Sequence, residues 1–284
     1  IRVVSYVKEL AGVHCPLVDV KKIIKYTDDY KRMRHDHDPF YQEIYVKKRI
    51  TPDMRFLEKM SVLAKVEKEI SKIRKKTPPF NAAGIKKKYK VHSVLNCPDV
   101  DAAEEMVAAC NRISATGDSA GGLVEVLVTG MPAGVGEPVF DKLDGELGKL
   151  MGIGAVKGVE VGAGFATKDM TGYECNDQMR TKKGKVVFDS NNAGGITGGV
   201  TTGQDIIIRV AVKPTPTIDR AQHTIDKYTL KNKMLEAITR RDPTIVARIW
   251  PVAENYTAMI LLDHLIAQFG YQKLLGLYNK PSKK

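Results

Sequence analysis

The sequence contains few of the residues that mark membrane, zinc-binding or disulfide-rich proteins. Aromatic residues make up only 7% of the 284 residues, and no apolar run reaches the ~18–20 residues needed to cross a bilayer. The four cysteines form no Cys-x-x-Cys pair, which argues against a zinc site and against a disulfide framework. We therefore expect a soluble protein with free thiols and no metal, located in a reducing compartment.

The positive charge is confined to one part of the chain. The net charge is +12, and residues 1–98 hold 23 Lys and Arg against 11 Asp and Glu, whereas residues 99–284 hold 22 of each. Because the basic excess belongs to one segment, it does not by itself indicate nucleic-acid binding. The sequence also has no RNA-binding aromatic motif and no DNA-reading helix signature.

Composition divides the chain into three segments. Residues 1–14 open with the alternating pattern of a strand. Residues 15–98 are charged and poor in glycine, and within them residues 51–76 have the apolar periodicity of a helix that begins at the capping residue Thr51. Residues 99–284 have a balanced charge and many glycines. We predict a core strand, a basic helical insertion and a C-terminal core, in that order.

Helices and strands of the third segment occur in clusters and do not alternate strictly. The patterns predict helices over 99–112, 140–151 and 256–269 and strands over 122–130, 155–165 and 205–213. No dinucleotide-binding fingerprint follows a strand. These features indicate an α+β fold with largely antiparallel sheets.

The motif GDSAGG at 117–122 resembles the loop around a serine-protease nucleophile. A protease also needs a histidine base and an aspartate that orients it. Asp118 directly precedes Ser119, and no partner motif occurs elsewhere. We therefore interpret Ser119 as a residue of a helix-to-strand turn.

Several later motifs suit an anionic or flat ligand. The segment 131–165 and the run SNNAGGITGGVTTGQ at 190–204 are dense in glycine, which lets backbone amides approach a ligand closely. KPTPTI at 213–218 supplies a lysine and two threonine hydroxyls. RRDPT at 240–244 places two arginines beside Asp242, which either accepts a proton or caps the next helix.

Taken in order, these motifs resemble the chorismate synthase family. The resemblance rests on GDSAGG, PAGVGEPVFDKLD, AVKGVEVGAGF, SNNAGGITGGVTTGQ, KPTPTI and RRDPTIVARIWPVAEN, and it covers residues 99–268 almost continuously. It implies a fold with helix layers sandwiched between antiparallel β-sheets, and a homotetramer. It further implies an anti 1,4-elimination of phosphate from 5-enolpyruvylshikimate 3-phosphate to give chorismate, in the shikimate pathway of aromatic amino acid biosynthesis.

The resemblance also implies a cofactor and its contacts. The family reaction requires reduced FMN, supplied in some members by a separate flavin reductase. By resemblance, Asp242 assists proton transfer near the reactive flavin nitrogen. The flavin contacts fall on Gly154, Ala155, Gly198, Lys213, Pro214, Thr215, Pro216, Thr217 and Arg240.

The sequence departs from the family pattern at named positions. Arg241 stands where the family has histidine, Thr244 where cysteine is frequent, and Pro216 where serine is common. The family's G-E-S-H-G and R-S-S-A-R-E-T segments do not occur, and none of the six histidines lies in a matching context. We therefore expect an incomplete fragment, inactive alone, from a cytoplasmic protein or one of a plastid or other organelle.

Two alternatives remain open at the level of sequence. A non-catalytic protein of the same fold would bind a partner through its basic insertion. The pattern HDHD at 35–38 would serve as a metal site or as an ordinary solvent loop.

Overall fold

A computed structural model describes residues 1–17, 19–37, 62, 65, 82–236, 242–270 and 276. The chain forms two compact units, one of residues 1–16 with 101–284 and one of residues 17–100. These divisions fall close to the boundaries that composition indicates. That the second unit is an insertion relative to the chorismate synthase pattern stays a prediction.

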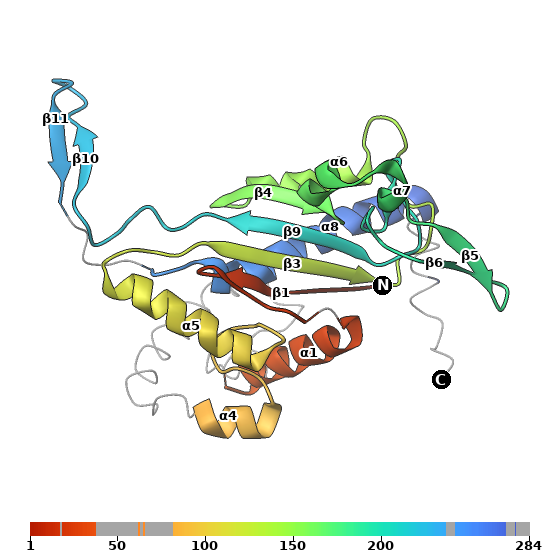
Figure 1. The fold of residues 1–284 in the computed structure, drawn as a ribbon, viewed down its shortest axis with the longest axis horizontal. Coiled ribbons are helices and arrows are strands. Elements are labelled where there is room, and N and C mark those ends of the chain that lie inside the picture. The colour runs from red at the N-terminus through yellow and green to blue at the C-terminus, as the bar shows by residue number, and fades with distance from the viewer. Residues whose placement is uncertain are drawn as a thin grey trace. The chain divides into compact units, whose positions relative to one another are not determined.

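An antiparallel sheet of five strands forms the centre of the first unit (Figure 1). Its strand order is β2-β1-β3-β9-β4, and every pair of neighbours is antiparallel. The strands are β1 (Arg2–Leu10), β2 (Val13–His14), β3 (Gly122–Thr129), β4 (Val156–Val161) and β9 (Ile206–Val212). Helices together with antiparallel sheets confirm the predicted α+β class.

The long helix α8 (Val246–Phe269) packs against β1 and β3 on one face of this sheet. Its buried side chains include Ile249, Ala253 and Leu261, and the Ser5 hydroxyl of β1 donates to the Trp250 carbonyl at 2.8 Å. The sequence predicted a helix only from residue 256. Pro251 inside the helix costs one backbone hydrogen bond. The burial of this apolar face outweighs that cost, and the helix therefore starts ten residues earlier.

The remaining elements of the first unit are short, apart from helix α5. They are α5 (Val100–Ala115), α6 (Leu143–Leu147), the 3-10 helices η2 (Gly148–Gly152) and η3 (Gly164–Asp169), α7 (Gly172–Cys175), and the hairpins β5 (Met179–Lys182) with β6 (Lys185–Phe188), β7 (Ile196–Thr197) with β8 (Val200–Thr201), and β10 (Gln222–Ile225) with β11 (Asn232–Leu235). Figure 1 shows the β10–β11 and β5–β6 hairpins at opposite ends of the sheet. The predicted helix over 140–151 is present as α6 followed by η2.

The second unit contains helices α1 (Val20–His37) and α4 (Ala82–Tyr89), which contact each other. Tyr30 of α1 donates to the Val94 carbonyl at 2.8 Å, and burial raises its pKa to about 12. The predicted helix over 51–76 lies outside the described residues except for Val62 and Lys65, which are helical.

The HDHD pattern begins in the last turn of α1. Asp36 accepts a hydrogen bond from the Tyr89 hydroxyl at 2.6 Å, and Asp38 lies outside the described residues. Within the described part of the chain, no three His, Cys, Asp or Glu side chains gather as metal ligands. No helix there combines the length and the apolar character that a bilayer requires.

Candidate functional site

Four loops meet where β9 ends and where β3 and β4 begin. They are residues 117–121, 154–155, 213–217 and 242–243, and we call this group the β9-end cluster. The sheet register explains the meeting, because Val212 at the end of β9 pairs with Gly122 of β3 and with Val156 of β4. The predicted cofactor residues of 154–155 and 213–217 therefore share one end of the sheet with Asp242.

The GDSAGG loop supports the KPTPTI segment. The Ser119 hydroxyl donates to the Thr215 carbonyl at 2.7 Å. A Cβ on Gly121 would lie 2.6 Å from the Val212 carbonyl oxygen and 3.0 Å from Pro214 Cδ. Ser119 therefore lies in the turn between α5 and β3, as predicted, and its hydroxyl holds a backbone carbonyl instead of meeting a histidine base.

The loop before β4 joins the same cluster through its backbone. The Lys213 N–H donates to the Ala155 carbonyl at 2.9 Å, and Ala155 has φ +69°. Gly154 is exposed, and a Cβ added there would meet nothing within 4 Å. The buried Thr215 Oγ1 has no hydrogen-bond partner among the residues that the structure describes. An exposed lysine, an open glycine and an unsatisfied hydroxyl together fit a polar, anionic ligand.

Asp242 is held by an arginine of α8. The Arg248 guanidinium donates to both Asp242 carboxylate oxygens at 3.2 Å. Helix α8 is capped at Ile245 and not at Asp242, so the helix-capping alternative for Asp242 is wrong. The neighbouring Pro243 carbonyl accepts from the Ala120 N–H at 2.8 Å, which ties residues 242–243 to the GDSAGG loop. Arg240 and Arg241 lie outside the described residues.

Gly198 lies at the other end of the sheet. It occupies the tight turn between β7 and β8, with φ +63°, and a Cβ added there would meet nothing within 4 Å. The segment that carries it leads into β9, whereas Lys213 follows the last residue of β9. Since β9 has 7 residues, the two ends lie roughly 20 Å apart. A single phosphate therefore cannot contact both Lys213 and Gly198 of one copy.

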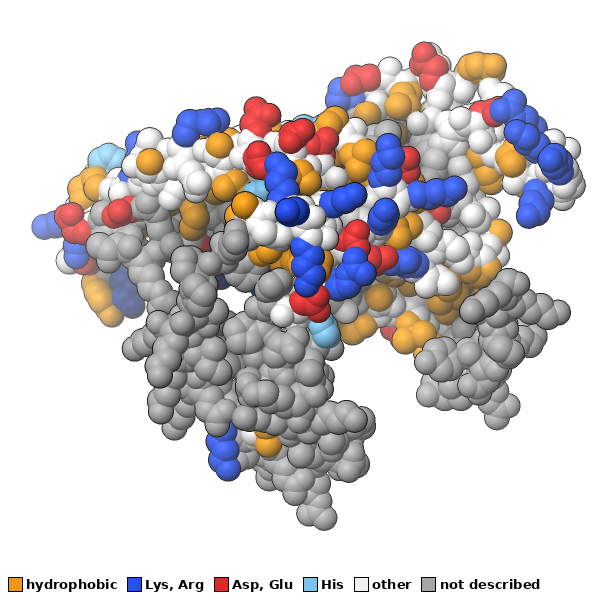
Figure 2. All heavy atoms as spheres, turned by 90° about the horizontal axis from the view of Figure 1, so that it is seen from below, with side chains coloured by type: hydrophobic (Ala, Val, Ile, Leu, Met, Phe, Trp, Pro, Cys, Tyr) orange, Lys and Arg blue, Asp and Glu red, His pale blue; other side chains and the backbone are white. Residues whose placement is uncertain are grey.

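A cleft of about 660 Å³ lies near Gly198. Its lining includes Thr197, Gln204 and Gln178, with Phe188 and Met179 from the base of the β5–β6 hairpin. The hairpin itself carries Arg180, Lys182, Lys183 and Lys185. Figure 2 shows Lys and Arg side chains gathered at the end of the molecule that this hairpin forms.

The glycine-rich segment 190–204 is fixed by a carboxylate. Asp177 accepts from the Ser190 hydroxyl at 2.6 Å and from the N–H groups of Asn192 and Ala193 at 2.7 and 2.9 Å. Burial raises the pKa of Asp177, but these three hydrogen bonds together hold it below its ordinary value.

We expect Asp177→Asn to destabilise the protein by about 1 kcal/mol at pH 7, because it weakens hydrogen bonds to a charged acceptor. A carboxylate with a lowered folded pKa stabilises the fold above its unfolded pKa, about 3.9. That contribution is lost as the pH falls through the folded pKa. Urea unfolding of both proteins at pH 7, 5 and 3 should show the difference shrink at pH 3. A difference that does not depend on pH would contradict this role.

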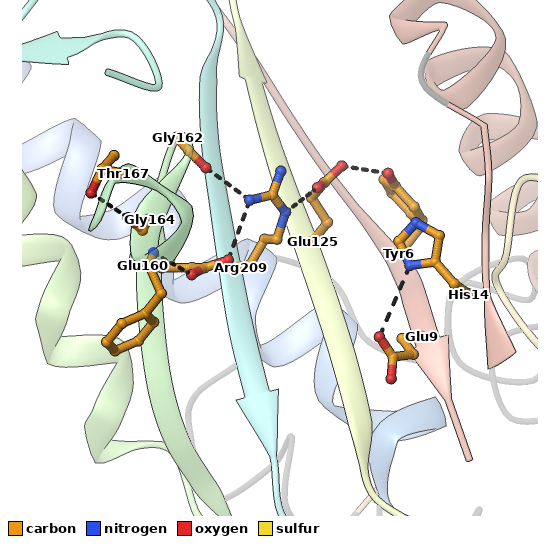
Figure 3. Close-up of polar contacts among 10 residues, drawn as sticks. Tyr6, Glu9, His14, Glu125, Glu160, Gly162, Gly164, Thr167 and Arg209 are labelled. Atoms are coloured by element: carbon orange, nitrogen blue, oxygen red, sulfur yellow. Dashed lines mark hydrogen bonds and ion pairs between the residues drawn. The ribbon is translucent and has the colours of Figure 1, made fainter. Parts of the chain in front are cut away.

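A row of polar side chains crosses the sheet on the face away from α8 (Figure 3). Tyr6, Glu125, Arg209 and Glu160 stand opposite one another on β1, β3, β9 and β4. The Tyr6 hydroxyl donates to Glu125, and Arg209 donates to Glu125 at 2.8 Å and to Glu160 at 3.3 Å. Ser5 faces α8, and successive strand residues point to opposite faces, which places Tyr6 on the other face.

This polar row was not predicted from the sequence. Burial lowers the pKa of Arg209, but the charges and hydrogen bonds of Glu125 and Glu160 raise it by more. The net pKa of Arg209 is therefore raised, and the guanidinium stays charged. Arg209 also donates to the Gly162 carbonyl at 2.8 Å. The available signal was one charged residue in β3, one in β9 and two in β4, but the strand register that aligns Glu125, Arg209 and Glu160 is a property of the fold.

The fold and the β9-end cluster define an α+β protein with a polar site at one end of an antiparallel sheet. The family model described as chorismate synthase matches residues 1–266. The chain therefore belongs to the chorismate synthase family.

Individual relatives agree with this assignment. The chain is 50% identical over 173 residues to a chorismate synthase of Methanosarcina barkeri, which covers 61% of this chain and 47% of the relative. It is 50% identical over 183 residues to that of Acetivibrio thermocellus, covering 63% and 46%. A crystal structure of chorismate synthase superposes with a TM-score of 0.61 at 20% identity, covering 98% of this chain and 60% of the other, and it supports the fold. The chain spans about half the length of the curated relatives it matches.

Proposed function

We propose that this chain serves the chorismate synthase reaction: the anti 1,4-elimination of phosphate from 5-enolpyruvylshikimate 3-phosphate, with reduced FMN as cofactor. Family membership supports the reaction class. The observation that carries the cofactor assignment is the contact between Ala155 and Lys213 beside the unsatisfied Thr215 hydroxyl. That the 284 residues alone do not turn over substrate stays a prediction, which an assay of chorismate formation tests.

The residues of the β9-end cluster have separate roles in this proposal. Lys213 supplies a positive charge for an anionic group, and Thr215 supplies a hydroxyl that is otherwise unsatisfied. Gly154 leaves room for a flat ring, because no atom beyond its two chain neighbours lies within 4 Å of the place where a side chain would begin. The neighbouring Ala155, Pro214, Pro216 and Thr217 shape the same surface, and Arg240 belongs to it by resemblance only.

Asp242 is the proposed proton acceptor. Reduced FMN, when bound, supplies transient electron donation as the phosphate leaves. Asp242 would assist removal of the ring proton, and the Arg248 guanidinium holds both of its carboxylate oxygens in place at 3.2 Å. Pro216 offers neither the hydroxyl nor the N–H of the serine common at this position, so Thr215 and Thr217 carry the hydrogen bonding of this segment.

A homotetramer accounts for two further features. Helix α8 exposes Val252, Met259 and Leu262, an apolar face that a neighbouring copy would cover. Gly198 is too far from Lys213 to serve the same site within one copy, so the proposal assigns it to the site of a neighbouring copy. Where the family depends on external reduction of FMN, a flavin reductase is a further partner. The four free cysteines fit a reducing compartment such as the cytoplasm.

Titration of FMN into the 284-residue chain tests this function. We expect the flavin absorbance spectrum to shift on binding, and the apparent Kd to fall by about tenfold when 5-enolpyruvylshikimate 3-phosphate is present, because substrate and cofactor share one pocket. Binding of FMN that substrate does not change would contradict the proposed reaction. Shikimate without its phosphate is the matched control and should have a smaller effect.

A further inference from the structure

The Arg209 guanidinium contacts the turn after β4 as well as the two strands that neighbour β9. It donates to Glu125 on β3 and to Glu160 on β4, the two strands that neighbour β9. A third bond, at 2.8 Å, reaches the backbone carbonyl of Gly162, beyond the end of β4. The third bond therefore holds the turn that follows the strand.

Glu160 also binds this turn. Its second carboxylate oxygen accepts from the Phe165 N–H at 3.1 Å. Gly164, with φ +52°, lies so close that a Cβ there would come 2.3 Å from this oxygen. Two neighbouring charged side chains thus bind one carbonyl and one N–H of the turn 162–165 (Figure 3).

The backbone of the turn 162–165 directly contacts the backbone of the glycine-rich segment 190–204. The Ala163 N–H donates to the Asn192 carbonyl at 2.7 Å. A Cβ on Gly194 would lie 2.3 Å from the Gly162 nitrogen, so the two backbones touch without space for a side chain. A displacement of Gly162 is therefore transmitted directly to residues 192–194.

We propose that Arg209 and Glu160 are positioning residues that set the place of the glycine-rich segment 190–204 through the turn 162–165. The effect on cofactor binding rests on the proposed function, because Gly198 belongs to this segment. The effect on the segment itself does not depend on any ligand.

The two carboxylates that Arg209 binds provide a matched pair of variants. Glu160→Gln weakens the pair with Arg209. It also replaces one of the two carboxylate oxygens, which accept separately from Arg209 and from Phe165, with an NH2 group that cannot accept. Glu125→Gln makes the same chemical change on the strand that does not lead to the turn. A residue that acted only on sheet register would give equal effects at the two positions.

Amide hydrogen exchange of the free protein separates these outcomes. In Glu160→Gln, we expect the amides of Gly162, Phe165 and Gly194 to exchange about tenfold faster. This factor corresponds to the loss of one hydrogen bond to a charged group. The amides that pair β1 with β3 should be unchanged. In Glu125→Gln, the turn amides should keep their protection.

Arg209→Lys provides a second variant. Lysine keeps the positive charge but has no planar fork of donors to reach Glu125, Glu160 and the Gly162 carbonyl together. It should accelerate exchange at the turn as Glu160→Gln does. Equal exchange at the turn in Glu160→Gln and Glu125→Gln, or protection in Arg209→Lys as strong as in the original chain, would overturn the proposal.

A parallel FMN titration distinguishes the positioning role of Arg209 and Glu160 from the proposed contact of Gly198 with the cofactor. Faster exchange at the turn together with weaker FMN binding supports both the positioning role and the contact of Gly198 with the cofactor. Faster exchange with unchanged FMN affinity supports the positioning role and contradicts the assignment of Gly198.

Discussion

Gly194→Ala is expected to destabilise the protein by about 3 kcal/mol. The new methyl group would lie 2.3 Å from the nitrogen and 2.5 Å from the Cα of Gly162, which are backbone atoms that cannot rotate away. An alanine at φ +63° also carries roughly 1–2 kcal/mol of conformational strain. Overpacking adds about 1–3 kcal/mol. Urea unfolding of the two proteins at pH 7 measures the difference.

Gly198→Ala is the matched control for this prediction. Gly198 has the same φ of +63°, but a Cβ there meets nothing within 4 Å. Gly198→Ala should therefore lower the free energy of unfolding only by the conformational strain of alanine at this φ, about 1 kcal/mol. Equal losses in the two variants would mean that the contact between Gly162 and Gly194 does not exist in solution.

The sheet could be predicted from the sequence largely because each strand carries its own pattern. The alternating residues of 1–10, 122–130 and 205–213 correspond to β1, β3 and β9. The strand predicted over 155–165 ends at Val161, because Gly162 and Gly164 have positive φ and turn the chain into η3. Local sequence patterns therefore predicted where strands occur more accurately than they predicted the residues at which those strands end.

The β5–β6 and β10–β11 hairpins were missed because their turns lack the usual residues. The β5–β6 turn consists of Lys183 and Gly184, at φ +52° and +72°, a backbone that normally favours asparagine before glycine. A lysine at this position gives no turn signal. The β10–β11 hairpin is joined by a longer connection that contains Leu230 at φ +55°, again a residue that seldom marks a turn.

The candidate site was predictable as a set of segments but not as an arrangement. Resemblance selected Ala155, Lys213 and Gly198 together, whereas the structure bonds the first two and places the third at the far end of β9. The polar row through Arg209 escaped prediction for a related reason. A charge within an apolar strand shows no partner until the register of the neighbouring strands is known.

Lys213→Met is expected to weaken FMN binding by tenfold or more. The proposed contact joins the ammonium group of Lys213 to an anionic group of the cofactor, and a hydrogen bond to a charged group contributes about 1.5–3 kcal/mol. About 1.4 kcal/mol corresponds to a factor of ten in Kd. Lys213 is exposed, so methionine should leave the free energy of unfolding within about 0.5 kcal/mol.

Lys168→Met is the control for the loss of one positive charge. Lys168 lies in η3, at the opposite end of β4 from Ala155, and pairs with Asp169 at 2.7 Å on the surface. Its removal changes the net charge by the same amount as Lys213→Met but leaves the β9-end cluster intact. FMN affinity should remain within about twofold of the original, because screening weakens charge effects over distances beyond ~10 Å.

The most direct test of the cofactor assignment is therefore one FMN titration, followed by flavin absorbance, of the original chain, Lys213→Met and Lys168→Met under the same buffer and salt. We predict saturable binding by the original chain, binding at least about tenfold weaker in Lys213→Met, and little change in Lys168→Met. Equal affinity in the original chain and Lys213→Met, or no FMN binding by the folded original chain, would contradict the assignment of the β9-end cluster as the cofactor site.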